Sequence, residues 1–226
     1  MDKHNSLLDK WLAIVKGGLI FVWYYGVSVT VYMAIYARLK DIDLCKAYVE
    51  LHQNKLMIVT YLMLFLGIWA FDKHKDVFLA YFKGIDGIAV FKYMFWAVGA
   101  YIICTILTNL LLPIFPDYEE INSVFEQNQY MLSFISTVVL APVVEEYIFR
   151  HKIRGYLKKI CPASIAIIFQ ALLFGALHTY TIQKIYAFLM GSFFGVVDEK
   201  EESVLPSIIM HMMINGIGWY IGCFVR

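Results

Sequence analysis

The chain has 226 residues, of which 61% are hydrophobic and only 16% charged, and its mean hydropathy is +0.65. Soluble domains are about half apolar and about a quarter charged, so one buried core cannot hide this much apolar surface, and lipid must cover part of it. The formal net charge of +1 excludes the strong charge imbalance of a nucleic-acid-binding protein or an acidic tail, and we expect no nucleic-acid partner.

The chain contains enough long apolar stretches for several transmembrane helices, each of which needs about 20 mainly apolar residues. We predict seven spans, at residues 12–36, 56–71, 89–113, 131–149, 163–180, 183–197 and 204–224. Because the fifth and sixth spans nearly touch, they could form one broken helix, and counts of six to eight are compatible with the sequence. The predicted fold is an all-α, polytopic transmembrane bundle, a single membrane domain over residues 1–226 without a soluble domain.

Charged connectors between the spans indicate the orientation, because short cytoplasmic loops are rich in Lys and Arg. Residues 117–129 contain four acids and neither Lys nor Arg, whereas residues 150–159 contain five Lys and Arg. The connector at 117–129 is therefore predicted to lie outside, and the one at 150–159 in the cytoplasm. With seven spans the N-terminus is also cytoplasmic, in the cell membrane. The predicted connector at residues 38–55 then lies outside although it has four basic residues, which argues against this orientation.

The fourth span ends in charged residues, EEYIFR at 145–150. A charge inside a span costs about 2.5–3.5 kcal/mol on insertion scales and so needs a reason. Neighbouring helical positions differ by about 100°, so Glu145 and Glu146 face different ways. Arg150 follows Glu146 by four residues, the spacing of a same-face ion pair, which leaves Glu145 without a partner on its own helix and available for proton transfer. An interfacial ion-pair cluster explains this segment equally well, and Pro142, which frees a carbonyl in the preceding turn, more often produces a simple kink.

The fifth span carries a histidine near its end, His178, 33 residues after Glu145. The best turn signal between the two, Cys161–Pro162, lies almost midway. Two antiparallel helices that meet at this turn would bring Glu145 and His178 to the same depth, about 24 Å from it at about 1.5 Å per residue. Phe174, one turn before His178, could position the histidine ring. Taken alone, such a histidine is more often a packed or interfacial residue than a catalyst.

The last span carries a histidine and an amide on one helical face. His211 and Asn215 are four residues apart within a run of Ile and Met. The amide of Asn215 could donate a hydrogen bond across the helix interface. For a single polar pair, joining two helices is the favoured interpretation.

In order, EEYIFR at 145–150, FGALH at 174–178 and HMMIN at 211–215 resemble the motifs of the CAAX protease and bacteriocin-processing membrane family, the type II CAAX prenyl endopeptidase-like proteins. The resemblance covers roughly residues 130–220, which would form the catalytic core, with residues 1–129 as accessory transmembrane helices. It implies an intramembrane endopeptidase; branches of the family remove the last three residues of prenylated proteins, process peptides or confer immunity to bacteriocins.

The resemblance also implies roles for individual residues. Glu145 would activate the attacking water with the help of His178, and His211 and Asn215 would stabilise the oxyanion. Glu146, Arg150 and Phe174 would support them. Glu145, His178 and His211 are also a ligand set suited to zinc, so a zinc cofactor stays open, although metal-free chemistry is the favoured alternative.

Two further function classes stay open beside the peptidase. The first is a catalytically idle membrane partner, such as an immunity or regulatory protein. The second is a transporter whose buried carboxylate moves protons, which is disfavoured because no inverted repeat is evident. For a peptidase we expect membrane lipid and a hydrophobic or lipidated peptide as partners. The sequence indicates neither the oligomeric state nor whether the peptide is prenylated.

Overall fold

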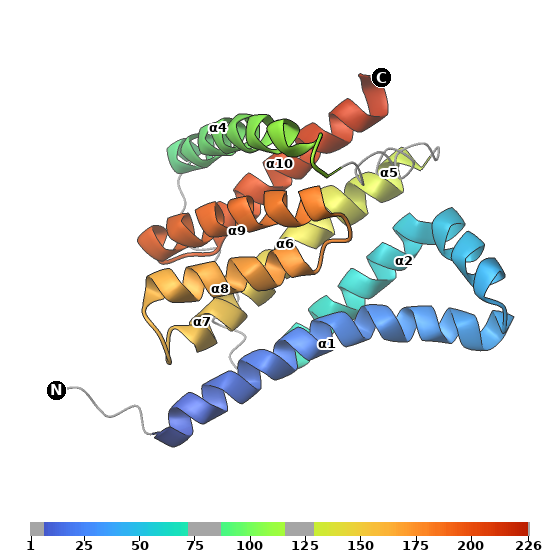
Figure 1. Cartoon of the computed structure of the whole chain (residues 1–226), viewed down its shortest axis with the longest axis horizontal. Helices are drawn as coiled ribbons and strands as arrows, with labels where there is room; N and C mark the ends of the chain where they lie inside the picture. The colour runs from blue at the N-terminus through green and yellow to red at the C-terminus, as the bar shows by residue number, and fades with distance from the viewer. Residues whose placement is uncertain (1–6, 72–86, 116–128, 226) are drawn as a thin grey trace.

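The computed structural model describes residues 7–71, 87–115 and 129–225, and within these residues it contains helices and no strand (Figure 1). A long central helix, residues 130–157, is joined by six others. These are α1 (Leu7–Leu39), α2 (Ile42–Phe71), α4 (Gly87–Leu111), α8 (Ala163–Ala176), α9 (Thr181–Glu201) and α10 (Leu205–Phe224). Each of the seven predicted spans overlaps one of these helices, so the predicted helical membrane bundle is confirmed.

Two predicted connectors are wrong, because most of their residues are helical. At 38–55 the chain needs only a short turn at Lys40 and Asp41 before α2 begins at Ile42. Lys40 has a left-handed backbone, with φ 54°, and the Asp41 carboxylate accepts a hydrogen bond of 2.9 Å from the Leu44 N–H. Asp is a good helix cap, and the polar residues that follow are compatible with a helix. At 150–159 the central helix continues to Leu157.

Five of the described helical segments are long and apolar enough to cross a membrane: α1, residues 42–68 of α2, α4, the central helix and α10. In the most apolar 18-residue stretch of the central helix, 56% is buried inside the protein, whereas in the corresponding stretch of α1 only 6% is buried. The central helix is thus an interior helix that can hold charged side chains, while most of α1 faces outward. The orientation of the N-terminus stays a prediction, and residues 117–128 of the predicted outer loop lie outside the described residues.

The central helix is not uniformly α-helical. It consists of α5 (Tyr130–Ser133), the π-helical segment η2 (Phe134–Leu140), α6 (Ala141–Glu146), the π-helical segment η3 (Tyr147–Ile153) and α7 (Arg154–Leu157). It contacts α1 and α2 on one side and α8, α9 and α10 on the others. π-Helical turns are rare and occur frequently at functional sites. Here they flank the short segment that ends in the two glutamates.

After the central helix the chain turns at residues 158–162, and α8 runs back along η3 and α7 (Figure 1). Helix α9 then packs closely along α8. Glycines allow this approach: a Cβ at Gly175 would lie 2.7 Å from the Lys184 carbonyl oxygen, and one at Gly195 would lie 3.0 Å from the Gln170 side chain. Small residues at such interfaces are a common way to pack membrane helices.

We expect Gly175→Ala to destabilise the bundle, because the added methyl group meets the backbone of α9, which cannot move without shifting the helix. Overpacking of this kind costs about 1–3 kcal/mol. Thermal unfolding of the purified protein in detergent should show a lower Tm. Gly18→Ala is the matched control, because nothing lies within 4 Å of a Cβ at that position. Equal Tm values for the two variants would contradict the proposed close contact between α8 and α9.

Candidate functional site

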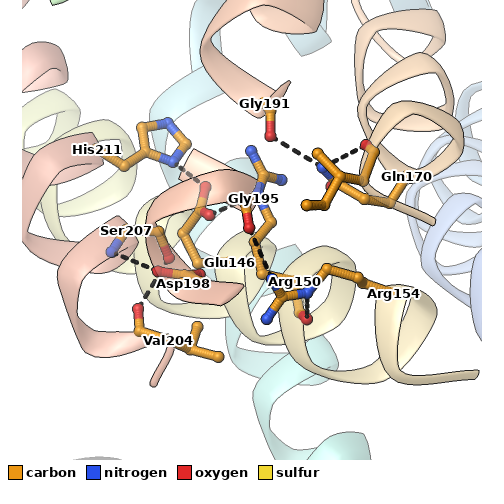
Figure 2. Close-up of polar contacts among 11 residues, drawn as sticks. Glu146, Arg150, Arg154, Gln170, Gly191, Gly195, Asp198, Val204, Ser207 and His211 are labelled. Atoms are coloured by element: carbon orange, nitrogen blue, oxygen red, sulfur yellow. Dashed lines mark hydrogen bonds and ion pairs between the residues drawn. The ribbon is translucent and has the colours of Figure 1, made fainter. Parts of the chain in front are cut away.

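The two adjacent glutamates point to different partners, as their helical positions predict. Glu146 is fully buried, and its Oε2 lies 2.8 Å from Arg150 Nε, so the predicted ion pair is confirmed (Figure 2). Its other oxygen, Oε1, lies 2.7 Å from His211 Nδ1. The contact with His211 was not predicted. Glu146 therefore links the central helix to α10 and holds a histidine that faces the cavity described below.

Arg150 is also fully buried, which requires compensation for its charge. Besides Glu146, its guanidinium lies over the Phe174 ring, 4.3 Å from the centroid, and 5.8 Å from the centroid of Phe194. Gly191 leaves space for it, because a Cβ there would come within 3.3 Å of Arg150 Nη2. Aromatic faces stabilise a cation at these distances, most strongly when water is excluded.

A second polar layer lies beside this pair and joins α9 to the central helix and to α10 (Figure 2). Arg154, predicted in a cytoplasmic connector, is instead buried and donates a 2.7 Å hydrogen bond to the Gly195 carbonyl. The carboxylate of buried Asp198 accepts a hydrogen bond of 3.1 Å from the Ser207 N–H. These contacts lock the helices that support the site.

Glu145 is half-buried and accepts hydrogen bonds from two tyrosines outside the central helix. Tyr24 on α1 donates to its Oε1 at 3.0 Å, and Tyr61 on α2 donates to the same oxygen at 2.5 Å. Neither tyrosine was predicted to lie at the site. A phenol inside an apolar span needs a polar partner, which is a signal, but with 16 tyrosines in the chain it does not single out these two.

His178 lies in the short turn between α8 and α9, just beyond the end of α8. Its Nδ1–H donates to the Phe174 carbonyl at 3.0 Å, and its ring meets the Phe174 ring edge-on, with the centroids 5.1 Å apart. Phe174 also meets the His211 ring, at 6.1 Å. The predicted contact of Phe174 with His178 is thus present. These contacts orient the imidazole of His178 and leave its Nε2 available.

Asn215 is held by a backbone carbonyl that the π-helical segment η2 exposes. The Ala141 N–H donates to the Ser136 carbonyl, the π-helical pattern. The next bond in that pattern would run from residue 142 to the Thr137 carbonyl, but Pro142 has no N–H. The Thr137 carbonyl instead accepts a hydrogen bond of 2.8 Å from Asn215 Nδ2. Pro142 therefore frees the acceptor that positions Asn215, while the second amide hydrogen of Asn215 is left for another partner.

The four predicted catalytic residues, Glu145, His178, His211 and Asn215, line one cavity of about 500 Å³. They come from three separate parts of the chain, and most of the remaining wall is aromatic or aliphatic, contributed by α2, α4, α9 and α10. Such a cavity, apolar with a few convergent polar groups, has the features of a ligand site. Within the part of the chain that the structure describes, no three His, Cys, Asp or Glu side chains are grouped to hold a metal ion. Glu145, His178 and His211 thus share the cavity but, as arranged here, do not fit a zinc ligand set.

Comparison with known proteins found a match for the second half of the chain. Residues 127–217 match the family model described as type II CAAX prenyl endopeptidase Rce1-like. The matched residues include all three motifs, so the resemblance stated from them is confirmed, and at the level of the family it supports an intramembrane CAAX-type endopeptidase. The match gives no support for a role in bacteriocin immunity. Neither the curated proteins nor the solved structures gave a match.

Proposed function

We propose that this chain, whose residues 127–217 match the type II CAAX prenyl endopeptidases, is an intramembrane endopeptidase that hydrolyses a peptide bond in a membrane-associated protein or peptide. The observation that carries the proposal is the shared cavity, which brings together a carboxylate from the central helix, a histidine from the turn after α8, and a histidine and an amide from α10. Such a set supplies both a base for water and donors for an oxyanion.

In the proposed mechanism Glu145 acts as the base. Its carboxylate, assisted by Nε2 of His178, takes a proton from a water molecule as the water oxygen attacks the scissile carbonyl carbon. The carbonyl oxygen becomes an oxyanion. When the C–N bond breaks, the same proton passes to the leaving nitrogen, and the products are a new amine and a new carboxylic acid, which then loses its proton to solvent. General acid–base catalysis of this kind contributes about 10²–10⁴-fold to the rate.

His211 and Asn215 are the proposed donors to the oxyanion. Nδ1 of His211 is hydrogen-bonded to Glu146 at 2.7 Å, so the Nε2 side of the His211 ring is left for the substrate. Donation to the oxyanion would use an Nε2–H of this ring. Asn215 offers the amide hydrogen that Thr137 does not use. Arg150 and Phe174 complete the support, because Arg150 pairs with Glu146 and Phe174 packs against both histidine rings.

Asn215→Ala tests the oxyanion role. We expect kcat to fall about 10²–10³-fold, the loss typical of one oxyanion donor, with a stability loss of only about 1 kcal/mol from the bond to Thr137. The measurements are kcat on a cleavable peptide and Tm in detergent. Asn109→Ala is the control, because Asn109 lines the same cavity from α4 and has no role in the mechanism. An equal loss of kcat in both variants would contradict the assignment.

The substrate is proposed to be a hydrophobic or lipidated peptide, since the cavity wall is mostly apolar and the protein lies among lipids. The proposed location is the cell membrane, with a cytoplasmic N-terminus, and this rests on composition and on the contrast between the acidic residues 117–129 and the basic residues at and just after the end of the central helix. No step is assigned to a metal ion.

The function can be tested with purified protein in liposomes. Two synthetic peptides of the same sequence, one prenylated near its C-terminus and one unmodified, are incubated with the wild type, and the products are identified by mass spectrometry. Cleavage of either peptide at a defined bond supports the proposal, and the comparison shows whether the prenyl group is required. If neither is cut, and membranes that contain the protein gain no new peptide termini, the idle membrane partner is the better explanation.

A further inference from the structure

The first two helices reach into the candidate site although they lie outside the matched residues 127–217. Tyr24 on α1 and Tyr61 on α2 both direct their hydroxyl groups at Oε1 of Glu145, at 3.0 and 2.5 Å. Tyr61 also lines the main cavity beside Glu145. Two phenols from separate helices thus converge on one oxygen of one carboxylate. This shared partner distinguishes them from single tyrosines at a membrane interface.

Packing holds both tyrosines in place. The Tyr24 ring meets the Phe149 ring edge-on, with the centroids 5.5 Å apart. Tyr61 is 9% exposed and belongs to a core cluster that also contains Val144 and Ile148 of the central helix. The rings are therefore fixed relative to the helix that carries Glu145.

The hairpin of α1 and α2 is itself closely packed. The Trp23 ring of α1 occupies the space that a Cβ would need at Gly67 of α2, so the two helices approach directly at this level. Both tyrosines thus lie on one pair of packed helices, and their distance from Glu145 does not depend on the conformation of a loop.

The hydrogen bonds have a defined chemical consequence. A carboxylate on a helix can rotate about its side-chain bonds, and two O–H donors on Oε1 restrict that rotation. They leave Oε2 as the oxygen that can accept the proton of a water molecule.

We propose that Tyr24 and Tyr61 are positioning residues that hold Glu145 for catalysis, so that the α1–α2 hairpin completes the active site. This inference rests on the proposed function, because it gives the tyrosines a role in the reaction of the same carboxylate. It assigns a specific task to helices that sequence analysis predicts to be accessory.

The test uses the full chain in liposomes and the Phe replacements, which remove only the hydroxyl groups. We expect Tyr24→Phe and Tyr61→Phe each to lower kcat about tenfold, and the double variant about 100-fold, with KM nearly unchanged. Tyr25→Phe is the matched control: the residue is adjacent to Tyr24, but it is 60% exposed and does not line the cavity. It should keep wild-type kcat.

A second arm separates positioning from general structural damage. In a Glu145→Gln background the base is already lost, so adding Tyr24→Phe and Tyr61→Phe should lower the residual rate no further. Folding is checked by Tm in detergent for every variant. If the double variant does not fold, the single Tyr24→Phe variant decides by its kcat.

The outcomes distinguish the inference from the function. If Glu145→Gln eliminates cleavage while the folded Phe variants keep wild-type kcat, the positioning role is overturned and the peptidase stands. A further fall in rate when the Phe changes are added to Glu145→Gln also overturns it. If Glu145→Gln itself cleaves at the wild-type rate, the proposed function fails, whatever the tyrosines do.

Discussion

Replacing Glu145 by Gln is expected to lower the rate of peptide hydrolysis by at least about 100-fold while leaving the fold intact. Gln has nearly the same shape, and its carbonyl oxygen can still accept hydrogen bonds from Tyr24 and Tyr61. It cannot take a proton from water, so the loss should approach the full contribution of a general base, about 10²–10⁴-fold in kcat. Because Glu145 is only half-buried, we expect a Tm close to that of the wild type.

The control for this change is Glu202→Gln, the same substitution at an exposed residue after α9. Both variants are purified and assayed with the same peptide and lipids. The expected result is wild-type kcat for Glu202→Gln and a kcat about 10²–10⁴-fold lower for Glu145→Gln. Retention of more than about a tenth of wild-type kcat by Glu145→Gln would be inconsistent with its role as the base.

The neighbouring change, Glu146→Gln, should have a different signature, with both stability and activity lost. Glu146 and Arg150 are fully buried 2.8 Å apart, and the neutral amide leaves the guanidinium charge without its partner. Breaking a buried ion pair by removing one member costs about 3–5 kcal/mol. Activity should fall as well, because the contact that holds His211 is weakened. Thermal and denaturant unfolding in detergent measure the first effect, and kcat measures the second.

A double replacement tests the reason for that instability. In Glu146→Gln combined with Arg150→Met, no unpaired charge is left among the aromatic rings, so part of the lost stability should return. Activity should not return, because His211 still lacks its carboxylate partner. If Glu146→Gln unfolds at the wild-type Tm, or if the double variant is less stable than the single one, the buried pair does not have the structural role described here.

The features that could be predicted from the sequence are those that depend on local spacing. The apolar stretches predicted the helices, because a chain this hydrophobic must span lipid. The divergence of Glu145 and Glu146 and the pairing of Glu146 with Arg150 follow from the geometry of one helix. The placement of His178 near Glu145 could also be predicted. A turn signal lies midway between the two residues, so the rise per residue of a helix puts both at the same depth.

The remaining features depend on contacts between distant parts of the chain, and the sequence has no local signal for them. Tyr24 and Tyr61 are 121 and 84 residues from Glu145 and look like any other aromatic residue in a span. The contact of His211 with Glu146 joins residues 65 apart. The π-helical segments, which flank α6, have no local signal in the sequence, although Pro142 predicts a freed carbonyl there.

The extent of the helices was also misjudged, and for one reason. The charge at 38–55 and at 150–159 predicts connectors, yet Lys, Arg and Glu are good helix formers, and a helix ends only where a turn or cap ends it. At Arg154 the consequence is larger, because a residue predicted to face the cytoplasm is buried against Gly195.

The most direct test of the central claim is a comparison of peptides released in membranes that contain the wild type, Glu145→Gln or Glu202→Gln at equal abundance. Mass spectrometry of newly formed termini needs no prior choice of substrate. We expect a set of cleavage products that is present with the wild type and with Glu202→Gln and absent with Glu145→Gln. The same products at the same levels with the wild type and with Glu145→Gln would contradict the claim that this carboxylate drives peptide hydrolysis.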